Sequence, residues 1–540
     1  MATDKNILPL WQRVLLTLSA AAFFCQTRVP RDIMIFSMST AVVFIWVVLG
    51  YVDRKYIIPP ATNRLMVVLP VLPAFGISFH VYRMYFDFYD AEPSRLIVAG
   101  SIFLVLGLPA VYLWCRVAWF GVADALRRAG IFQISKKEAS IYASVFLMGV
   151  AAIIAAYSVT SAFGGTSDGV TTLYTLDSLY SSEGSIFVNL VHIENDIRQP
   201  LFMPFSGPFA GWAYPIAVMS PAVGAVCLQL SQFAMMFMGD ILIASAVTED
   251  SRKRVMFVLL MRCSQAGILY MLAMEQYQSV YFWLAVCVCL ASRNEEIGPF
   301  EVCGMTGTLV SGAAILPLLE KGDSFAEKIG KCVIHGCAFI AAIILACRFE
   351  LLWSISTRIQ RLLKFTGIGI SMNERISQYL ASIPDVFVMP AGGITVAKEG
   401  ILATQAGGLL DASGQPVWAV FAGRERGVFG IVILVLCAVA FLICRKRRVA
   451  VISAGWIGVW VLCLVIVGWG TFEDQLILYC LYFGWACMAL LFMLTEQICE
   501  WLKKPRATLV IAAVGAVGML CVNIPGFIDM IKAFEIYYPA

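Results

Sequence analysis

One segment of the chain gathers acidic, amide and basic side chains that could bind and deprotonate a hydroxyl group. Between residues 161 and 221, Asp177 follows a run of Thr and Tyr, and Asp196 precedes Arg198 by two positions. A carboxylate at a membrane surface can take a proton from an attacking hydroxyl, and a nearby guanidinium can hold a phosphate. We therefore expect Asp177 and Asp196 to be catalytic, with substrate contacts from His192, Glu194, Asn195, Arg198 and Gln199.

Three further residues could meet the same ligand. Glu275 ends a predicted apolar span beside Tyr277, and an ionisable residue at such a position is a candidate functional group. Arg358 and Arg361 lie on the basic face of an amphipathic stretch, 350–365, that could hold a lipid phosphate or contact anionic headgroups. All three are predicted to bind substrate, although a span end or a lipid contact would also explain them.

The cysteines give no sign of a metal site or a disulfide framework. Most of the 17 lie inside apolar runs, and no Cys-x-x-Cys occurs. Such cysteines behave as small hydrophobic residues. We expect no cofactor, and the sequence leaves a requirement for a divalent metal open.

The composition indicates that a membrane bundle positions these groups. The chain of 540 residues is 60% hydrophobic and 14% charged, with a mean hydropathy of +0.83, whereas soluble domains are about 25% charged. We predict an all-α polytopic bundle of about 13 spans. The apolar runs lie near 10–26, 33–51, 65–81, 97–118, 140–160, 222–247, 254–274, 279–292, 332–349, 428–444, 450–469, 475–497 and 507–524.

Two segments should enter the membrane without crossing it. The run 303–319 is short and rich in small residues, so we expect it to be re-entrant. Prolines interrupt the apolar stretch 205–221, which predicts short interfacial helices at the end of the first long outer loop.

The basic residues predict which end of the bundle faces the cytoplasm. They cluster in short loops beside span ends, and such loops remain inside, at 54–55, 127–137, 252–254, 445–448 and 503–506. The long segments 161–221 and 350–427 would then face outward. We divide the chain into a four-span segment, 1–135, a core with the catalytic-loop candidate, 136–375, and a C-terminal part, 376–540.

The order of these features resembles the GT-C superfamily of integral membrane glycosyltransferases. The resemblance rests on a span, an acidic outer loop and the run Arg198-Gln199-Pro200-Leu201-Phe202 before interfacial helices. The stretch 468–486, beginning Gly468-Trp469-Gly470-Thr471-Phe472-Glu473-Asp474, looks like the distal part of an uncharacterised bacterial branch. The resemblance covers about 137–540. The family's Asp-Glu pair after the first core span is absent, so Asp168 or Asp177 would replace it.

This resemblance implies a reaction and its partners. A sugar would move from a polyprenyl-phosphate carrier to an envelope glycan or lipid acceptor on the outer face of a bacterial cytoplasmic membrane. Membrane lipid would surround this multi-pass chain, and no nucleic acid would take part.

Two other functions remain open. An O-antigen-type polymerase or ligase would use arginines of a large outer loop, for which the candidates are Arg358, Arg361, Arg375, Arg424 and Arg426. A transporter or flippase of a lipid-linked saccharide would carry ionisable residues inside its spans and often an inverted repeat. We detect no repeat, and the charges that we single out lie at the outer rim, which favours an enzyme.

Overall fold

The described part of the chain is almost entirely helical. The computed structural model describes residues 67–78, 93–128, 130–131, 134–160, 163, 201–274, 277–305, 324–346, 366, 369–389, 394–395, 419–420, 427–469 and 479–537, with isolated positions between 10 and 17 and at 360 and 363. Two short strands, β1 (Ile394–Thr395) and β2 (Ala419–Val420), form an antiparallel pair.

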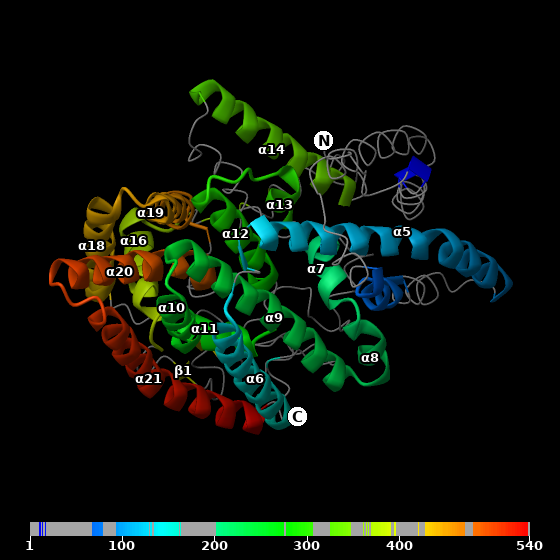
Figure 1. Ribbon diagram of the computed structural model, residues 1–540. Coiled ribbons are helices and arrows are strands. Elements are labelled where there is room, and N and C mark those ends of the chain that lie inside the picture. The colour runs from blue at the N-terminus through cyan, green and yellow to red at the C-terminus, as the bar shows by residue number, and fades with distance from the viewer. Residues whose placement is uncertain are drawn as a thin grey trace.

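Figure 1 shows how the described helices are arranged. The first half of the chain contains α5 (Pro93–Arg128), α6 (Lys136–Val159), α7 (Phe202–Ala210), α8 (Ala213–Met219), α9 (Pro221–Val247), α10 (Ser251–Cys263), α11 (Gln265–Leu272) and α12 (Tyr277–Ser292). The second half contains α13 (Pro299–Gly304), α14 (Phe325–Ala346), α16 (Met372–Asp385), α18 (Gly427–Cys444), α19 (Arg448–Val461), the π-helix η6 (Leu462–Ile466), α20 (Cys480–Trp501) and α21 (Ala507–Tyr537).

Six of the described helices are long and apolar enough to cross a membrane. A seventh span results if α10 and α11, which meet at a bend of 67°, are taken as one. The helical membrane protein that the sequence predicts is therefore supported, but the number of about 13 spans is not confirmed. Most of 10–51 and of the re-entrant candidate 303–319 lies outside the described residues.

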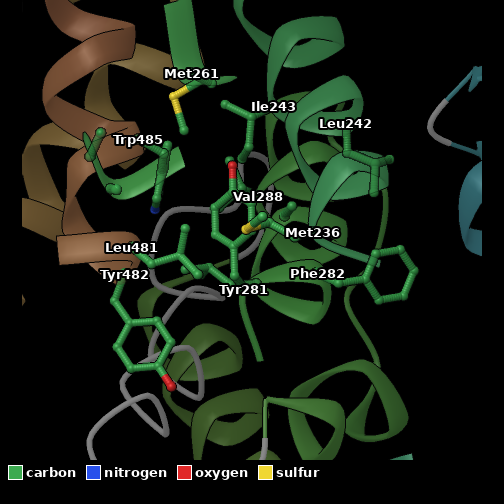
Figure 2. Packing of buried hydrophobic residues seen from close by; sticks show 14 of the residues in the cluster. Met236, Leu242, Ile243, Met261, Tyr281, Phe282, Val288, Leu481, Tyr482 and Trp485 are labelled. Carbon is green, nitrogen blue, oxygen red and sulfur yellow. The ribbon is translucent and has the colours of Figure 1, made fainter. Parts of the chain in front are cut away.

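The helix α12 forms the centre of the bundle. Its side chains are buried on every side from Tyr277 to Ala291, and α9, α19 and α20 pack around it. A helix that is hydrophobic all round belongs in such an interior. Figure 2 shows the ring of Tyr281 enclosed by neighbours such as Met261 and Leu481. By contrast α6, α18 and α21 expose long rows of apolar side chains, as lipid-facing helices do.

The short helices expected before residue 221 are present as α7 and α8. Phe205 of α7 is 3% exposed, and its ring contacts those of Trp114, Trp283 and Phe300. The indole N–H of Trp119 donates to the carbonyl of Pro208 at 2.9 Å. Helix α7 is therefore held inside the bundle, between α5, α9 and α12, more deeply than an interfacial helix requires.

Candidate functional site

Of the side chains that the sequence analysis selects as candidates, the structure describes Arg375. Outside the described residues lie Asp168, Asp177, His192, Glu194, Asn195, Asp196, Arg198, Gln199, Glu275, Arg358, Arg361, Arg424 and Arg426. The structure does describe the residues that flank these segments, where the chain leaves the helical bundle.

The acidic segment and Glu275 leave the bundle at the same point. Met274, which precedes Glu275, donates its backbone N–H to the carbonyl of Phe163 at 3.0 Å. Phe163 in turn precedes the segment 164–200. The hydroxyl of Tyr157 lies 3.2 Å from this carbonyl and 3.1 Å from that of Leu272, so it ties both chain segments to the end of α6. Two candidates far apart in the sequence thus start from adjoining positions.

Aromatic side chains join a third acidic segment to the same end. The ring of Tyr277 contacts those of Tyr270, Tyr479 and Tyr482, with centroids 5.9, 6.1 and 5.2 Å away. Trp469 donates its indole N–H to the hydroxyl of Tyr479 at 3.0 Å. Trp469 and Tyr479 flank residues 470–478, so the two ends of that segment lie beside Tyr277.

The basic clusters gather at the opposite end of the helices. Arg254, at the start of α10, forms two hydrogen bonds of 2.8 and 2.7 Å with Glu138, at the start of α6. Lys253 and Arg447 each lie 2.5 Å from a carboxylate oxygen of Glu496, near the end of α20. Clusters from three loops therefore share one end, as the charge pattern predicts, and the candidate segments emerge at the other.

A break divides the span formed by α10 and α11. Ser264 ends α10 and caps α11, accepting the N–H of Gly267 at 3.0 Å. The next two N–H groups, of Gln265 and Ala266, donate to the carbonyls of Phe387 and Val386 at 3.0 and 3.2 Å. Backbone groups freed at membrane depth need partners inside the protein, and the segment after α16 supplies them here.

Asn523 of α21 completes this junction. Its Oδ1 accepts the N–H of Met389 at 2.7 Å, and its Nδ2 donates to the carbonyls of Cys263 and Phe387, both at 2.9 Å. The side chain is fully buried. One amide therefore joins α21, the end of α10 and the residues that lead into 390–426. Sequence analysis missed Asn523, although an Asn in an apolar run is itself a signal of interhelical bonding.

An ion pair lies within the spans next to this break. Arg262 Nε is 2.5 Å from Asp240 Oδ2, and the hydroxyl of Tyr281 donates to Asp240 Oδ1 at 2.9 Å. Asp240 is 0% exposed and Arg262 is 8% exposed. Sequence analysis missed both, although each interrupts an otherwise apolar run and charged residues inside spans are rare and call for an explanation.

Arg375, one of the arginines considered for the polymerase alternative, contacts backbone carbonyls. It donates to Ile466 at 3.0 Å and to Ile370 at 3.2 Å, so it ties the start of α16 to the end of η6. These contacts give Arg375 a structural role in capping a helix end.

Comparison of the chain with protein family models, with curated proteins and with solved structures gave no match. Within the described residues, no three His, Cys, Asp or Glu side chains lie close enough together to hold a metal ion.

Proposed function

We propose that this chain is an integral membrane glycosyltransferase that uses a polyprenyl-phosphate-linked sugar. The reaction would take place at the end of the bundle opposite the basic clusters, which corresponds to the outer face of the cytoplasmic membrane. The observation that carries the proposal is the hydrogen bond between Met274 and Phe163. It brings together the starting points of two segments that were selected only for their chemistry.

The proposed reaction needs a base, an acceptor and a stabilised leaving group. Asp177 or Asp196 accepts the proton of the acceptor hydroxyl, whose oxygen attacks the anomeric carbon of the donor sugar. The bond between that carbon and the phosphate oxygen breaks, and polyprenyl phosphate leaves. Arg198 stabilises the charge that develops on the phosphate.

Release of polyprenyl phosphate by the purified chain tests this proposal. A panel of polyprenyl-phosphate sugars is supplied with acceptor, and Asp177→Asn or Asp196→Asn should slow transfer by roughly 100-fold or more. Asp529→Asn is the matched control, because this carboxylate of α21 is 74% exposed and only 3.9 Å from Lys532. Lack of release with every donor would refute the proposal, and equal loss in all three variants would refute the assignment of the base.

A transporter or flippase of a lipid-linked saccharide is the second candidate. The buried pair of Asp240 and Arg262 beside a broken span is the observation in its favour, since ionisable residues inside spans mark many transport pathways. Translocation of a lipid-linked saccharide in liposomes, without release of the carrier phosphate, would replace the enzyme by this function. Loss of transfer only in Arg358→Gln and Arg361→Gln would instead favour a polymerase or ligase.

A further inference from the structure

Two glutamines from neighbouring helices cap the C-terminal end of α11. The last carbonyls of a helix have no partner within the helix itself. Gln229 of α9 donates its Nε2 to the carbonyls of Tyr270 and Met271, at 3.2 and 2.7 Å. Gln278 of α12 donates its Nε2 to those of Tyr270 and Ala273, at 3.0 and 2.7 Å. Both amide nitrogens are therefore fully used by this helix end.

The oxygen of each of these amides is left without a donor. Within the described part of the chain, Oε1 of Gln229 and Oε1 of Gln278 accept no hydrogen bond, and both side chains are 0% exposed. Exchanging the oxygen and nitrogen of either amide would set an oxygen against two carbonyl oxygens, so the contacts fix the orientation. A buried acceptor without a partner costs about 1–3 kcal/mol, which points to a bound group that is not part of the polypeptide.

The two oxygens lie around one point of negative potential. An amide oxygen is about 2.3 Å from its nitrogen, so each Oε1 lies within about 5.5 Å of the Tyr270 carbonyl that both amides share. The C-terminal end of a helix also carries roughly half a negative charge. Arg262, near the other end of α11, is paired with Asp240. These features together favour a cation at the end of α11.

We propose that the end of α11 binds one alkali metal cation through Oε1 of Gln229 and Oε1 of Gln278, with water completing the coordination shell. Neutral carbonyl oxygens replace the hydration shell of monovalent ions in K⁺ channels, whereas Ca²⁺ and Mg²⁺ sites use carboxylates. Ends of interrupted helices coordinate Na⁺ in transporters, and α10 and α11 form such an interrupted span. The proposal does not depend on sugar transfer.

Binding of radioactive sodium and rubidium ions to the purified full chain tests this site. Each isotope is titrated in detergent at constant ionic strength, with N-methylglucamine chloride as the replacement salt. Rubidium substitutes for potassium, so the isotope that binds more tightly identifies the size of ion that fits. We expect saturable binding of about one ion per chain, and a melting temperature that rises with the concentration of that ion.

Two substitutions of Gln278 have opposite expected effects. Gln278→Lys keeps N–H donors for the helix end but replaces the amide oxygen with a positive charge, so it should abolish saturable binding and the dependence of the melting temperature on the ion. Gln278→Glu adds a negative charge and should strengthen binding roughly tenfold or more. Gln497→Lys is the matched control at the basic end of the bundle, where Gln497 donates to Glu500 at 3.4 Å. It should leave binding unchanged.

Lack of saturable binding of both isotopes to the unaltered chain would overturn the proposal without reference to any variant, and ordered water would then satisfy the amide oxygens. Unchanged binding in a folded Gln278→Lys chain would also overturn it. If that variant does not fold, Gln278→Glu decides, because binding no tighter than in the unaltered chain would place the ion elsewhere.

Discussion

The amide of Asn523 should be a major contributor to the stability of the bundle. Asn523→Ala removes three hydrogen bonds at once, two to carbonyls and one from a backbone N–H, and leaves those groups buried. Hydrogen bonds within membrane bundles contribute about 0.6–1.5 kcal/mol each. We therefore expect the free energy of unfolding to fall by about 2–4 kcal/mol.

Denaturation of the purified chain in detergent, followed by tryptophan fluorescence, measures this loss. Val522→Ala is the matched control on the same helix, because Val522 is 50% exposed and its truncation should cost less than about 1 kcal/mol. Asn523→Asp is a sharper test. It keeps an acceptor for the N–H of Met389 but turns an oxygen toward two carbonyls, so it should destabilise at least as much as alanine does.

Two results would refute this reasoning. If Asn523→Ala and Val522→Ala lowered stability by the same small amount, the three hydrogen bonds would contribute little beyond what the unfolded chain recovers in detergent. If Asn523→Asp matched the unaltered chain, the Nδ2 donors would not be bonded to Cys263 and Phe387.

Three further changes test other contacts. Asp240→Asn leaves Arg262 as a buried charge and should lower the free energy of unfolding by about 3–5 kcal/mol, whereas adding Arg262→Gln should restore part of it in the same denaturation assay. Gly430→Ala places a methyl group against a backbone carbonyl of α16 and should lower the free energy of unfolding by about 1–3 kcal/mol. The control Gly458→Ala has no neighbouring atom within 4 Å of the added methyl group and should be neutral or slightly stabilising. Equal melting temperatures for the two variants would contradict the packing of α16 on α18. Arg445→Cys, in a chain whose reactive cysteines are removed, should react with a membrane-impermeant maleimide only from the cytoplasmic side, and labelling from outside would reverse the orientation.

Hydropathy predicts the long spans of this chain well. The apolar runs at 140–160, 222–247, 428–444 and 507–524 coincide with α6, α9, α18 and α21. A membrane span can be recognised directly in the sequence, because it needs about 20 contiguous apolar residues. The clustering of basic residues likewise predicted which loops meet at one end.

The internal junctions could not be predicted in the same way. The run 254–274 is apolar on both sides of Ser264, so a hydropathy window does not detect the break between α10 and α11. The pairing of Asp240 with Arg262 depends on which faces of two helices meet, and composition does not specify this. A polar interruption inside an apolar run is the one available signal, and Asn523 carries it as well.

For the candidate site, the sequence predicts which residue types could react but not where they lie relative to one another. The types and spacing of Asp177, Asp196 and Glu275 suggested a function, but no pattern in the residues predicts the contact between residues 163 and 274. That placement depends on the packing of α6 against α11, which arises from long-range contacts.

The contact between Cys263 and Asn523 also constrains how the chain is made. The two residues are 260 positions apart in the sequence. At a synthesis rate of about 5–20 residues per second, α21 is therefore made roughly 10–50 s after α10 and α11. During that interval the carbonyl of Cys263 lies at membrane depth without its final amide donor. Helix α21 therefore completes this junction late in synthesis, and nascent chains that stop before it should be retained by the insertion machinery or degraded.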